Sequence, residues 1–265
     1  MNIDLHNHTP RCNHATGSME AFALEAIAQK IDVFGFSDHA PLRWDEGYRM
    51  SADEMDAYES EFFALKDKYK GKIVLLLGYE ADYLPSKAID AVFERKVDYL
   101  IGSAHFIDLW SFDNPESVFD GFGADEFNKR GLDETWRAYF AAIADMAASG
   151  LFDIVGHFDL IKIFGHYREK KPDEAVENAL AAIAKAGMAI EINFSGWRKP
   201  VKEQYPSAEI LKLAYALKIP ITFGSDAHAI DHIGYKRPLA YDLARSAGYS
   251  EAAIFENRKM RLVKI

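Results

Sequence analysis

The chain alternates short, apolar, β-rich runs with longer segments whose apolar residues recur at helical spacing. Strands that alternate with helices are typical of a parallel sheet joined by right-handed crossovers. Seven such strands, with no break in composition between them, predict a single β/α barrel. The predicted strands cover residues 3–5, 33–37, 73–78, 99–103, 154–156, 189–193 and 221–224.

Three of the helical segments begin at residues whose side chains cap helices. Ser51 opens a capping box, and the helix that follows it is expected to end before Gly71. Asp173 and Ser207 are suited to cap two more helices, the first of which should end at Gly187. The expected core-facing positions are Met55, Tyr58, Phe62, Leu65 and Tyr69, then Val176, Leu180 and Ile183, then Ile210, Leu213, Ala214 and Leu217.

Two connections, residues 38–50 and 106–133, are longer than is usual between such elements. Long loops inside compact domains are commonly functional. Both follow the carboxyl end of a predicted strand, which is where β/α barrels carry their active sites. The second loop is rich in Phe, Trp, Asp and Gly, so it is a candidate lid or specificity loop.

The length of 265 residues suits one barrel, and we expect residues 1–265 to form a single domain. Apolar residues make up 49% of the chain and charged residues 27%, which excludes a largely disordered polymer. The net charge of −10 argues against a nucleic-acid partner, because binding a phosphate backbone requires clustered Lys and Arg. A small anionic substrate is not excluded, since bound metal ions invert the local field.

Cysteine content and apolar runs bear on the compartment. Cys12 is the only cysteine, so no intrachain disulfide can form and a reducing environment fits. The N-terminal residues have neither the basic nor the apolar stretch of a signal peptide. Since no apolar run approaches the ~20 residues that cross a bilayer, we expect a cytoplasmic protein with no membrane partner. The sequence leaves the oligomeric state open.

Most of the nine histidines fall where predicted strands end. His6 and His8 follow the first strand, and Asp226 and His228 follow the last, each pair spaced to share one face of an extended segment. A lone histidine at a strand end is more often a hydrogen-bonded core residue, but parallel strand ends meet at one rim, so a recurring pattern indicates a metal site. Imidazole and carboxylate ligands suit Zn²⁺, Mn²⁺ or Fe²⁺. The expected ligands are His6, His8, His14, His39, Glu80, His105, His157, Asp226 and His228.

Three neighbours of these ligands are open to two interpretations. Asp4 alternates in phase with His6, so it can either orient a ligand imidazole or form a polar layer of the barrel. Asp38, next to His39, is similarly undecided. Cys12 is better explained as a small buried residue than as a ligand.

The motifs resemble those of the PHP domain (polymerase and histidinol phosphatase) family. Residues 4–9, Asp-Leu-His-Asn-His-Thr, are similar to the first family motif, together with Cys12 and His14. The resemblance implies a distorted β/α barrel with seven strands and a trinuclear metal centre. Further matches follow in the family's order at residues 37–39, 78–80, 102–105, 156–159 and 224–228.

The resemblance also implies how the ligands divide. It assigns His6, His8, Glu80 and Asp226 to a first ion, Glu80 again with His105 and His157 to a second, and His14, His39 and His228 to a third.

Within the family the chain resembles the histidinol-phosphatase branch, through residues 157–168, 192–200 and 205–207. The implied activity is hydrolysis of L-histidinol phosphate to L-histidinol and phosphate, in histidine biosynthesis. The implied cofactors are two to three divalent transition-metal ions, and the partner is a small phosphorylated substrate. Arg168 and Arg198 match arginines that the branch uses near the phosphate, although a solvated surface arginine is the alternative for each.

The expected chemistry is attack by a metal-bound hydroxide. Two ions bridged by Glu80 would lower the pKa of a bound water, while Arg168 and Arg198 would clamp the phosphoryl oxygens. The proton donor for the leaving group stays open among Asp226, a metal-bound water and a histidine at the rim. Carboxylates of the long loop are candidates to pair with an amino group of the substrate: Asp108, Asp113 and Glu116.

Three alternatives remain. The same chemistry can serve another ester, such as a nucleotide, a sugar phosphate or a phosphotyrosine protein. The barrel can instead be a noncatalytic metal-binding module, but the complete ligand set and a chain that ends soon after the barrel favour a freestanding enzyme. An amidohydrolase is disfavoured because no lysine stands at a strand end to form a carbamylated metal bridge.

Overall fold

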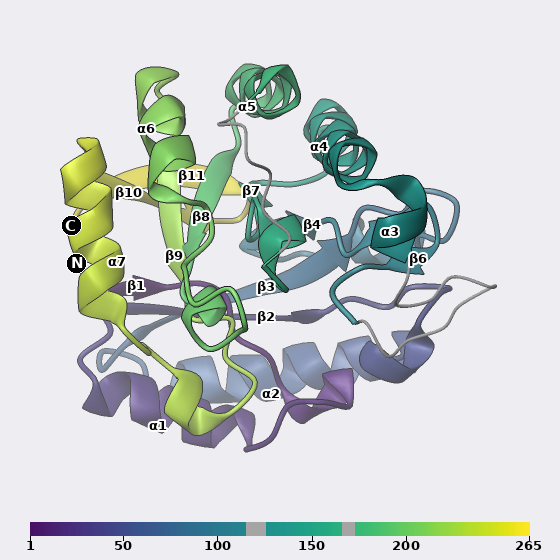
Figure 1. The fold of residues 1–265 in the computed structure, drawn as a ribbon. Helices are drawn as coiled ribbons and strands as arrows, with labels where there is room; N and C mark the ends of the chain where they lie inside the picture. The colour runs from purple at the N-terminus through teal and green to yellow at the C-terminus, as the bar shows by residue number, and fades with distance from the viewer. Residues whose placement is uncertain (115–125, 166–172) are drawn as a thin grey trace.

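A computed structural model describes residues 1–114, 126–165 and 173–265. Seven parallel strands form one sheet in the order β1-β2-β3-β4-β7-β8-β9. Its two outer strands meet, because Leu5 N donates to Phe223 O at 2.8 Å and Asn7 bridges Ala227 in parallel. The sheet is therefore a nearly closed barrel (Figure 1). The strands are β1 (Ile3–Asp4), β2 (Val33–His39), β3 (Val74–Asp82), β4 (Tyr99–Ser103), β7 (Ile154–Val155), β8 (Ala189–Asn193) and β9 (Ile221–Gly224).

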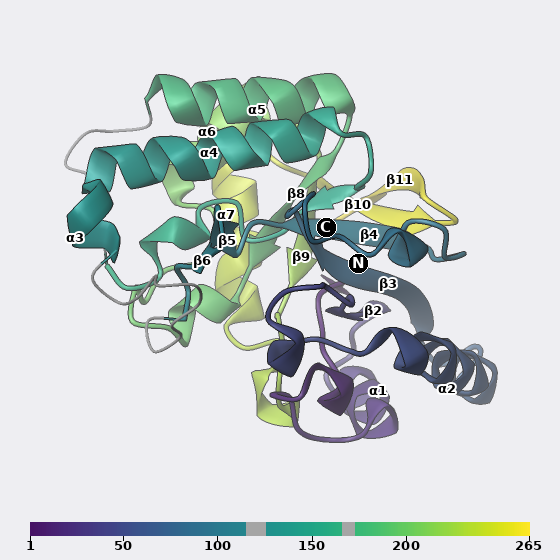
Figure 2. The same ribbon diagram turned by 90° about the vertical axis from the view of Figure 1, so that its right-hand side faces the viewer.

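Helices cover the outside of the barrel (Figures 1 and 2). They are α1 (Met19–Ala28), α2 (Met55–Lys68), α3 (Glu126–Arg130), α4 (Leu132–Ala148), α5 (Glu174–Ala186), α6 (Ala208–Ala216) and α7 (Arg237–Ala247). Residues 83–98, all described, connect β3 to β4 through only the short 3-10 helix η4 (Asp90–Val92). The barrel therefore departs from a regular β/α repeat between β3 and β4, where no α-helix is present.

Shorter elements complete the fold. Two antiparallel hairpins are formed by β5 (Phe106–Ile107) with β6 (Trp110–Ser111), and by β10 (Glu251–Glu256) with β11 (Lys259–Lys264). The remaining 3-10 helices are η1 (Pro10–Cys12), η2 (Glu46–Tyr48), η3 (Ala52–Glu54), η5 (Leu160–Lys162), η6 (Ser195–Trp197) and η7 (Ile230–His232).

The seven strands and their order confirm the predicted distorted (β/α)7 barrel, with two strands longer than expected. β2 continues to His39 and β3 to Asp82, because parallel neighbours extend the ladder through His39↔Glu80 and Asp82↔Ser103. His39 and Glu80 therefore lie inside strands and not just after them. Their side chains are held more firmly than loop residues would be.

The predicted caps of α5 and α6 are confirmed, whereas the capping box at Ser51 opens the 3-10 helix η3, which leads into α2. Asp173 Oδ1 accepts from the amide of Ala175 at 3.2 Å, and Gly187 ends α5 in the left-handed conformation. Ser207 Oγ accepts from Ile210 N at 3.4 Å at the start of α6. The expected core position of Leu217 is wrong, because α6 ends one residue earlier and Leu217 is exposed.

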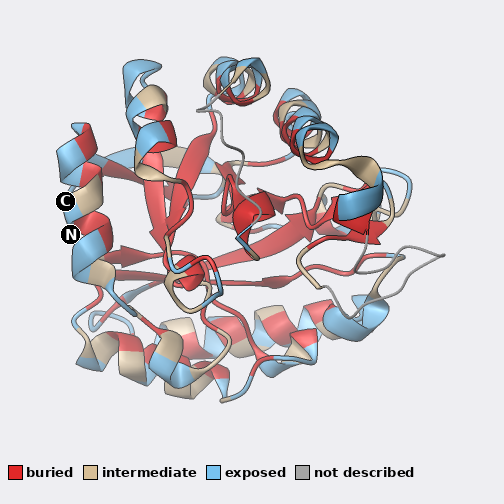
Figure 3. Ribbon diagram, in the orientation of Figure 1, coloured by how far each residue is buried: buried red, intermediate tan, exposed pale blue. Residues whose placement is uncertain are grey.

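Buried apolar side chains, among them Leu5, Tyr99 and Ile192, form a cluster beneath the strand ends. The seven strands are buried along their length except at Val74, the first residue of β3 (Figure 3). Tyr99 lies within the cluster, and its hydroxyl donates to Leu5 O at 2.6 Å. Gly78 makes room for it, because a Cβ there would lie 2.6 Å from the Tyr99 ring. The C-terminal hairpin covers the barrel at the end where β4 begins. The centroid of the Phe255 ring lies 6.4 Å from that of Tyr99.

The two chain ends lie side by side (Figure 1), and the Met1 amino group donates to Lys264 O at 2.8 Å. Among the described residues, no helix combines the length and the apolar character needed to cross a membrane.

Candidate metal centre

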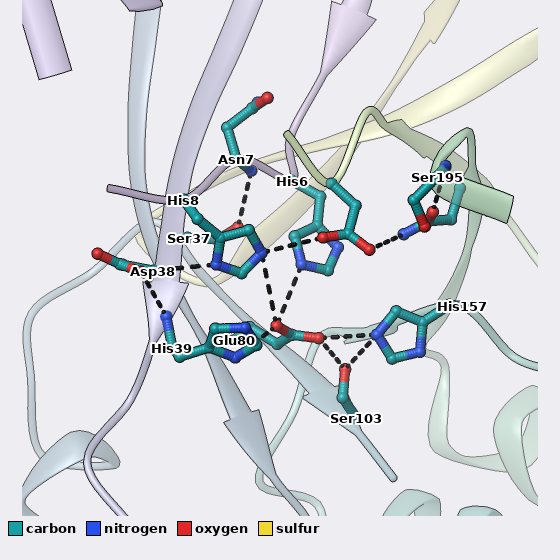
Figure 4. Close-up of polar contacts among 12 residues, drawn as sticks. His6, Asn7, His8, Ser37, Asp38, His39, Glu80, Ser103, His157 and Ser195 are labelled. Carbon is teal, nitrogen blue, oxygen red and sulfur yellow. Dashed lines mark hydrogen bonds and ion pairs between the residues drawn. The ribbon is translucent and has the colours of Figure 1, made fainter. Parts of the chain in front are cut away.

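Glu80 lies at the centre of a ring of histidines at the carboxyl ends of the strands (Figure 4). Its side chain is 1% exposed. Oε2 is 2.9 Å from His39 Nδ1 and 3.3 Å from His6 Nε2, and Oε1 is 2.8 Å from His157 Nε2. Ser103 Oγ donates to Oε1 at 2.6 Å. The two oxygens thus face different histidines, as a bridging carboxylate requires.

Two further histidines approach the same carboxylate. His8 Nε2 lies 3.7 Å from Glu80 Oε2 and 3.2 Å from Asp226 Oδ1. His105 Nε2 lies 3.6 Å from Glu80 Oε1. Each comes from a different strand end, which explains how residues distant in the sequence meet here.

The remaining two histidines lie on the open side of the cluster. The ring of His228 stacks on His8 with 4.0 Å between centroids, and the ring of His14 lies 4.6 Å from His228. The structure therefore brings together all nine side chains that the sequence proposes as metal ligands.

Donor atoms that lie within 4.8 Å of one another form several groups that can each hold an ion. Two of these groups fall within ligand sets that the family resemblance implies. The third set is different: His39 and His228 group with His8, and His14 groups with His228 and Cys12. The groups in question are His6, His8 and Glu80, then Glu80, His105 and His157, then His8, His39 and His228.

Unpaired buried atoms test whether metal ions fit. Within the described part of the chain, several buried donors and acceptors of the cluster have no hydrogen-bond partner, a state that costs free energy in a protein interior. Divalent cations among them would satisfy these atoms, and imidazole with carboxylate is the donor set of Zn²⁺, Mn²⁺ and Fe²⁺. The residues therefore fit such ions. The atoms without a hydrogen bond are His6 Nε2, His8 Nδ1 and Nε2, His39 Nδ1, Glu80 Oε2, His157 Nδ1 and His228 Nε2. His39 Nδ1 and Glu80 Oε2 are close, at 2.9 Å, but do not have the geometry of a hydrogen bond.

The electrostatics of the cluster favour bound positive charge. Burial alone would raise the pKa of Glu80, but neighbouring histidines, His6 foremost, lower it well below its ordinary value. Burial also lowers the pKa of His39 and of His228 well below the ordinary value, so both imidazoles are neutral. An ionised carboxylate and neutral imidazoles are the forms that bind metal. Burial works to lower the pKa of His6, His8 and His105 too, but the neighbouring carboxylates raise it above the ordinary value, so a bound cation would replace protons at these three rings.

Carboxylates behind the histidines fix their orientation. Glu191 Oε1 lies 2.7 Å from His6 Nδ1, and Asp82 Oδ1 lies 2.6 Å from His105 Nδ1. Such partners orient a metal-ligating imidazole and raise its basicity. Neither carboxylate was among the residues expected from the sequence, although a charged residue within the apolar run 189–193 was a usable signal.

The undecided neighbours now have assigned contacts. Asp4 Oδ1 accepts hydrogen bonds from Ser225 N at 2.8 Å and from Asn7 at 3.0 Å. It is therefore a polar residue inside the barrel, which links β1 to the residue that follows β9. Asp38 accepts a hydrogen bond from Thr9 and from the backbone of His39. Cys12 is buried and its thiol donates to a backbone carbonyl, as expected of a small buried residue.

A cavity of about 570 Å³ lies over the cluster. Arg198 lines it, and its NH2 donates to Ser225 O at 2.8 Å and to Asp226 O at 2.9 Å. Its NH1 is buried and has no partner among the described residues. Asp113 also lines the cavity, whereas Asp108 is 71% exposed and pairs with Arg130 at 2.9 Å.

Three expectations concern residues outside the described part of the chain. Arg168 and Glu116 lie outside the described residues, as does the middle of the proposed lid loop, residues 115–125. The described parts of that loop form the β5–β6 hairpin and α3.

The chain is similar to several known proteins. The model of the PHP domain family matches residues 4–195. A protein of Deinococcus radiodurans named as a probable histidinol-phosphatase is 38% identical over 263 residues, which is 97% of this chain and 98% of that protein. The histidinol-phosphatase of Bacillus subtilis is 29% identical over 88% of this chain and 95% of its own length.

A solved structure supports the fold. The histidinol phosphate phosphatase of Lactococcus lactis, crystallised with zinc, L-histidinol and phosphate, aligns with a TM-score of 0.78 over 98% of each chain, at 23% identity. The barrel, the family model and the Deinococcus relative agree with one another. The chain therefore belongs to the PHP domain family, in its histidinol-phosphatase branch.

Proposed function

We propose that this protein is a metal-dependent phosphomonoesterase that hydrolyses L-histidinol phosphate to L-histidinol and phosphate in histidine biosynthesis. The observation that carries the proposal is the convergence of seven histidines on Glu80 and Asp226 beneath one cavity. The relatives named histidinol-phosphatase support the substrate.

The cofactors we propose are two to three divalent transition-metal ions, Zn²⁺, Mn²⁺ or Fe²⁺, held by the nine converging side chains. When bound, such ions act as Lewis acids toward phosphoryl oxygens and acidify water. Glu80 would be the carboxylate shared by two of them, a role supported by Oε1 facing His157 and Oε2 facing His6. The hydrogen bond from Ser103 fixes the rotation of that carboxylate.

Arg198 is the group we propose to bind the phosphate. Arg198 lines the cavity, two backbone carbonyls hold its NH2, and its buried NH1 has no hydrogen-bond partner among the residues described. A charge-assisted hydrogen bond from NH1 to a phosphoryl oxygen would remove that deficit. Arg168 is proposed for the same role on the resemblance alone.

Asp226 is proposed both as a ligand and as a participant in proton transfer. Burial works to raise its pKa, but His6 and His8 together lower it well below the ordinary value. The carboxylate is therefore ionised and holds no proton for the leaving group, so any part it takes in proton transfer would be to accept a proton from the attacking water, as a weak base. The donor to the leaving alkoxide is not assigned.

We also propose that residues 1–265 act as one domain. The last strand of the barrel, β9, leads into Asp226 and pairs with β8, while its backbone accepts from Leu5 near the N-terminus. The site is therefore assembled from both ends of the chain.

A panel of phosphate esters tests the substrate. Metal-replete protein should hydrolyse L-histidinol phosphate with a kcat/KM roughly 10²-fold or more above p-nitrophenyl phosphate, a nucleotide, a sugar phosphate and a phosphotyrosine peptide. Equal values across the panel would make it a broader phosphoesterase. No hydrolysis of any ester would favour a noncatalytic metal-binding module.

A further inference from the structure

Arg49 is a buried cation in the loop between β2 and α2, with its side chain 6% exposed. Nε donates to Asp82 Oδ2 at 2.8 Å, and NH2 donates to Asp82 Oδ1 at 3.2 Å. NH1 donates to the carbonyl of Tyr48 at 2.9 Å. All three guanidinium nitrogens are thus engaged by the protein, although the residue lines the cavity.

Asp82 passes this constraint to the metal centre. The same Oδ1 that accepts from Arg49 lies 2.6 Å from His105 Nδ1. With Nδ1 donating to Asp82, His105 presents its Nε2 toward Glu80. A fork-shaped guanidinium fixes the plane of the carboxylate, and the carboxylate fixes the plane of the imidazole.

The backbone around Arg49 holds two other parts of the centre. Its carbonyl accepts from Asn13 Nδ2 at 3.1 Å, and Asn13, in a left-handed conformation, immediately precedes His14. The next amide, of Met50, donates to the carbonyl of His39 at 3.2 Å. Arg49 and Met50 therefore form hydrogen bonds to His39 itself, to the residue before His14, and to the carboxylate that orients His105.

We propose that Arg49 is a positioning residue of the metal centre, which orients His105 through Asp82 and anchors the turn that carries His14 through Asn13. The inference rests on the proposed metal-dependent function. It distinguishes Arg49 from Arg198, whose buried NH1 has no partner within the described chain and is therefore the arginine suited to an anion.

The test measures metal affinity by chelator competition, and kcat and KM for L-histidinol phosphate, in Arg49→Met and Arg49→Lys. Loss of an outer partner of a ligand typically weakens metal affinity or activity 10- to 100-fold, so we expect Arg49→Met to lower both metal affinity and kcat by about that factor. KM should stay within about threefold, since uniform substrate binding is not removed. Arg49→Lys should recover part of the loss, because lysine keeps the charge but not the fork.

A double-mutant cycle with Asp82→Asn tests the route of the effect. If Arg49 acts through Asp82, the double variant should be no worse than the more damaged single variant. Arg49→Met alone leaves the buried charge of Asp82 unpaired and could prevent folding. The double variant removes both charges, so it can be measured even in that case. Arg95→Met is the matched control, because Arg95 pairs with Glu59 at 2.6 Å away from the cavity.

Two results would overturn the inference. One is Arg49→Met with wild-type metal affinity and kcat but a raised KM, which would make Arg49 a substrate-binding residue. The other is full additivity of the Arg49 and Asp82 losses. Wild-type protein measured alongside separates the two proposals: an inactive wild type that binds no metal overturns the proposed function, and the inference with it. If the wild type is active and Arg49→Met has the same metal affinity and kcat, only the inference about Arg49 is overturned.

Discussion

Glu191 on β8 orients His6 at the end of β1, with its Oε1 2.7 Å from His6 Nδ1. Its Oε2 accepts from the amide of His157 at 2.9 Å and from Asn193 at 3.0 Å. Because these residues come from three separate strands, a single carboxylate sets the spacing of two proposed ligands. Figure 4 shows both His6 and His157 joined to the carboxylate of Glu80 by ion pairs.

Glu191→Gln should therefore weaken the centre without unfolding the barrel. The amide keeps the size of the carboxylate but loses the charge that holds His6 Nδ1–H, so metal affinity and kcat should fall about 10- to 100-fold. Chelator competition and steady-state kinetics measure both. Glu209→Gln, at an exposed position of α6, is the control and should match wild type. Wild-type metal affinity in Glu191→Gln would disprove this role.

Gly224→Ala should destabilise the fold and disturb the same carboxylate. An added Cβ would lie 1.9 Å from Glu191 Oε1 and 2.5 Å from His6 Cβ, so both residues must shift. Overpacking of this kind costs about 1–3 kcal/mol. Denaturant unfolding of the metal-free protein measures the loss. Gly47→Ala is the control, because a Cβ there meets nothing within 4 Å. Equal stability of the two variants would refute the packing argument.

Arg198→Met should impair phosphate binding more than metal binding. Removing one charge-assisted hydrogen bond costs about 1.5–3 kcal/mol, so we expect KM for the ester and the inhibition constant of inorganic phosphate to rise roughly 10- to 100-fold. Metal content should stay at the wild-type value. Arg245→Met, which removes an exposed arginine, serves as the control. A loss of metal with an unchanged KM would contradict the assignment.

Removal of the ions should lower thermal stability. Several buried atoms of the cluster have no hydrogen-bond partner in the described part of the chain and would gain one from an ion. An ion present at 100 times its dissociation constant adds about 2.7 kcal/mol. For a chain of this size that corresponds to a fall in Tm of roughly 5–10 °C after exhaustive chelation. Differential scanning calorimetry before and after re-addition of Zn²⁺ or Mn²⁺ measures it. An unchanged Tm would count against ion binding.

Much of the fold could be predicted because its determinants are local. A strand buried on both faces, such as residues 189–193, is a short apolar run. Helix ends at Asp173 and Gly187 follow from cap chemistry. The histidine cluster could be predicted for a different reason, since parallel strand ends meet at one rim and bring side chains such as His6 and His228 together.

The rest depends on pairwise contacts that periodicity does not encode. Asp82 and Arg49 meet only because β3 and the loop after β2 lie side by side. The C-terminal hairpin turns at Asn257 and Arg258, both left-handed, and Arg258 has no sequence signature for such a turn. Its guanidinium is held by Asp153, a residue 105 positions away.

Metal content of Glu80→Gln compared with wild type tests the central claim most directly. Elemental analysis of gently purified wild-type protein should find two to three transition-metal ions per chain. Glu80→Gln should lose at least one of them and about 10³-fold or more of kcat, because the bridging charge on which the histidines converge is gone. Glu59→Gln, which changes a partly buried glutamate that pairs with Arg95 outside the cavity, should keep the full complement. Wild-type protein without bound metal, or a Glu80→Gln variant with an unchanged metal content and kcat, would contradict the account.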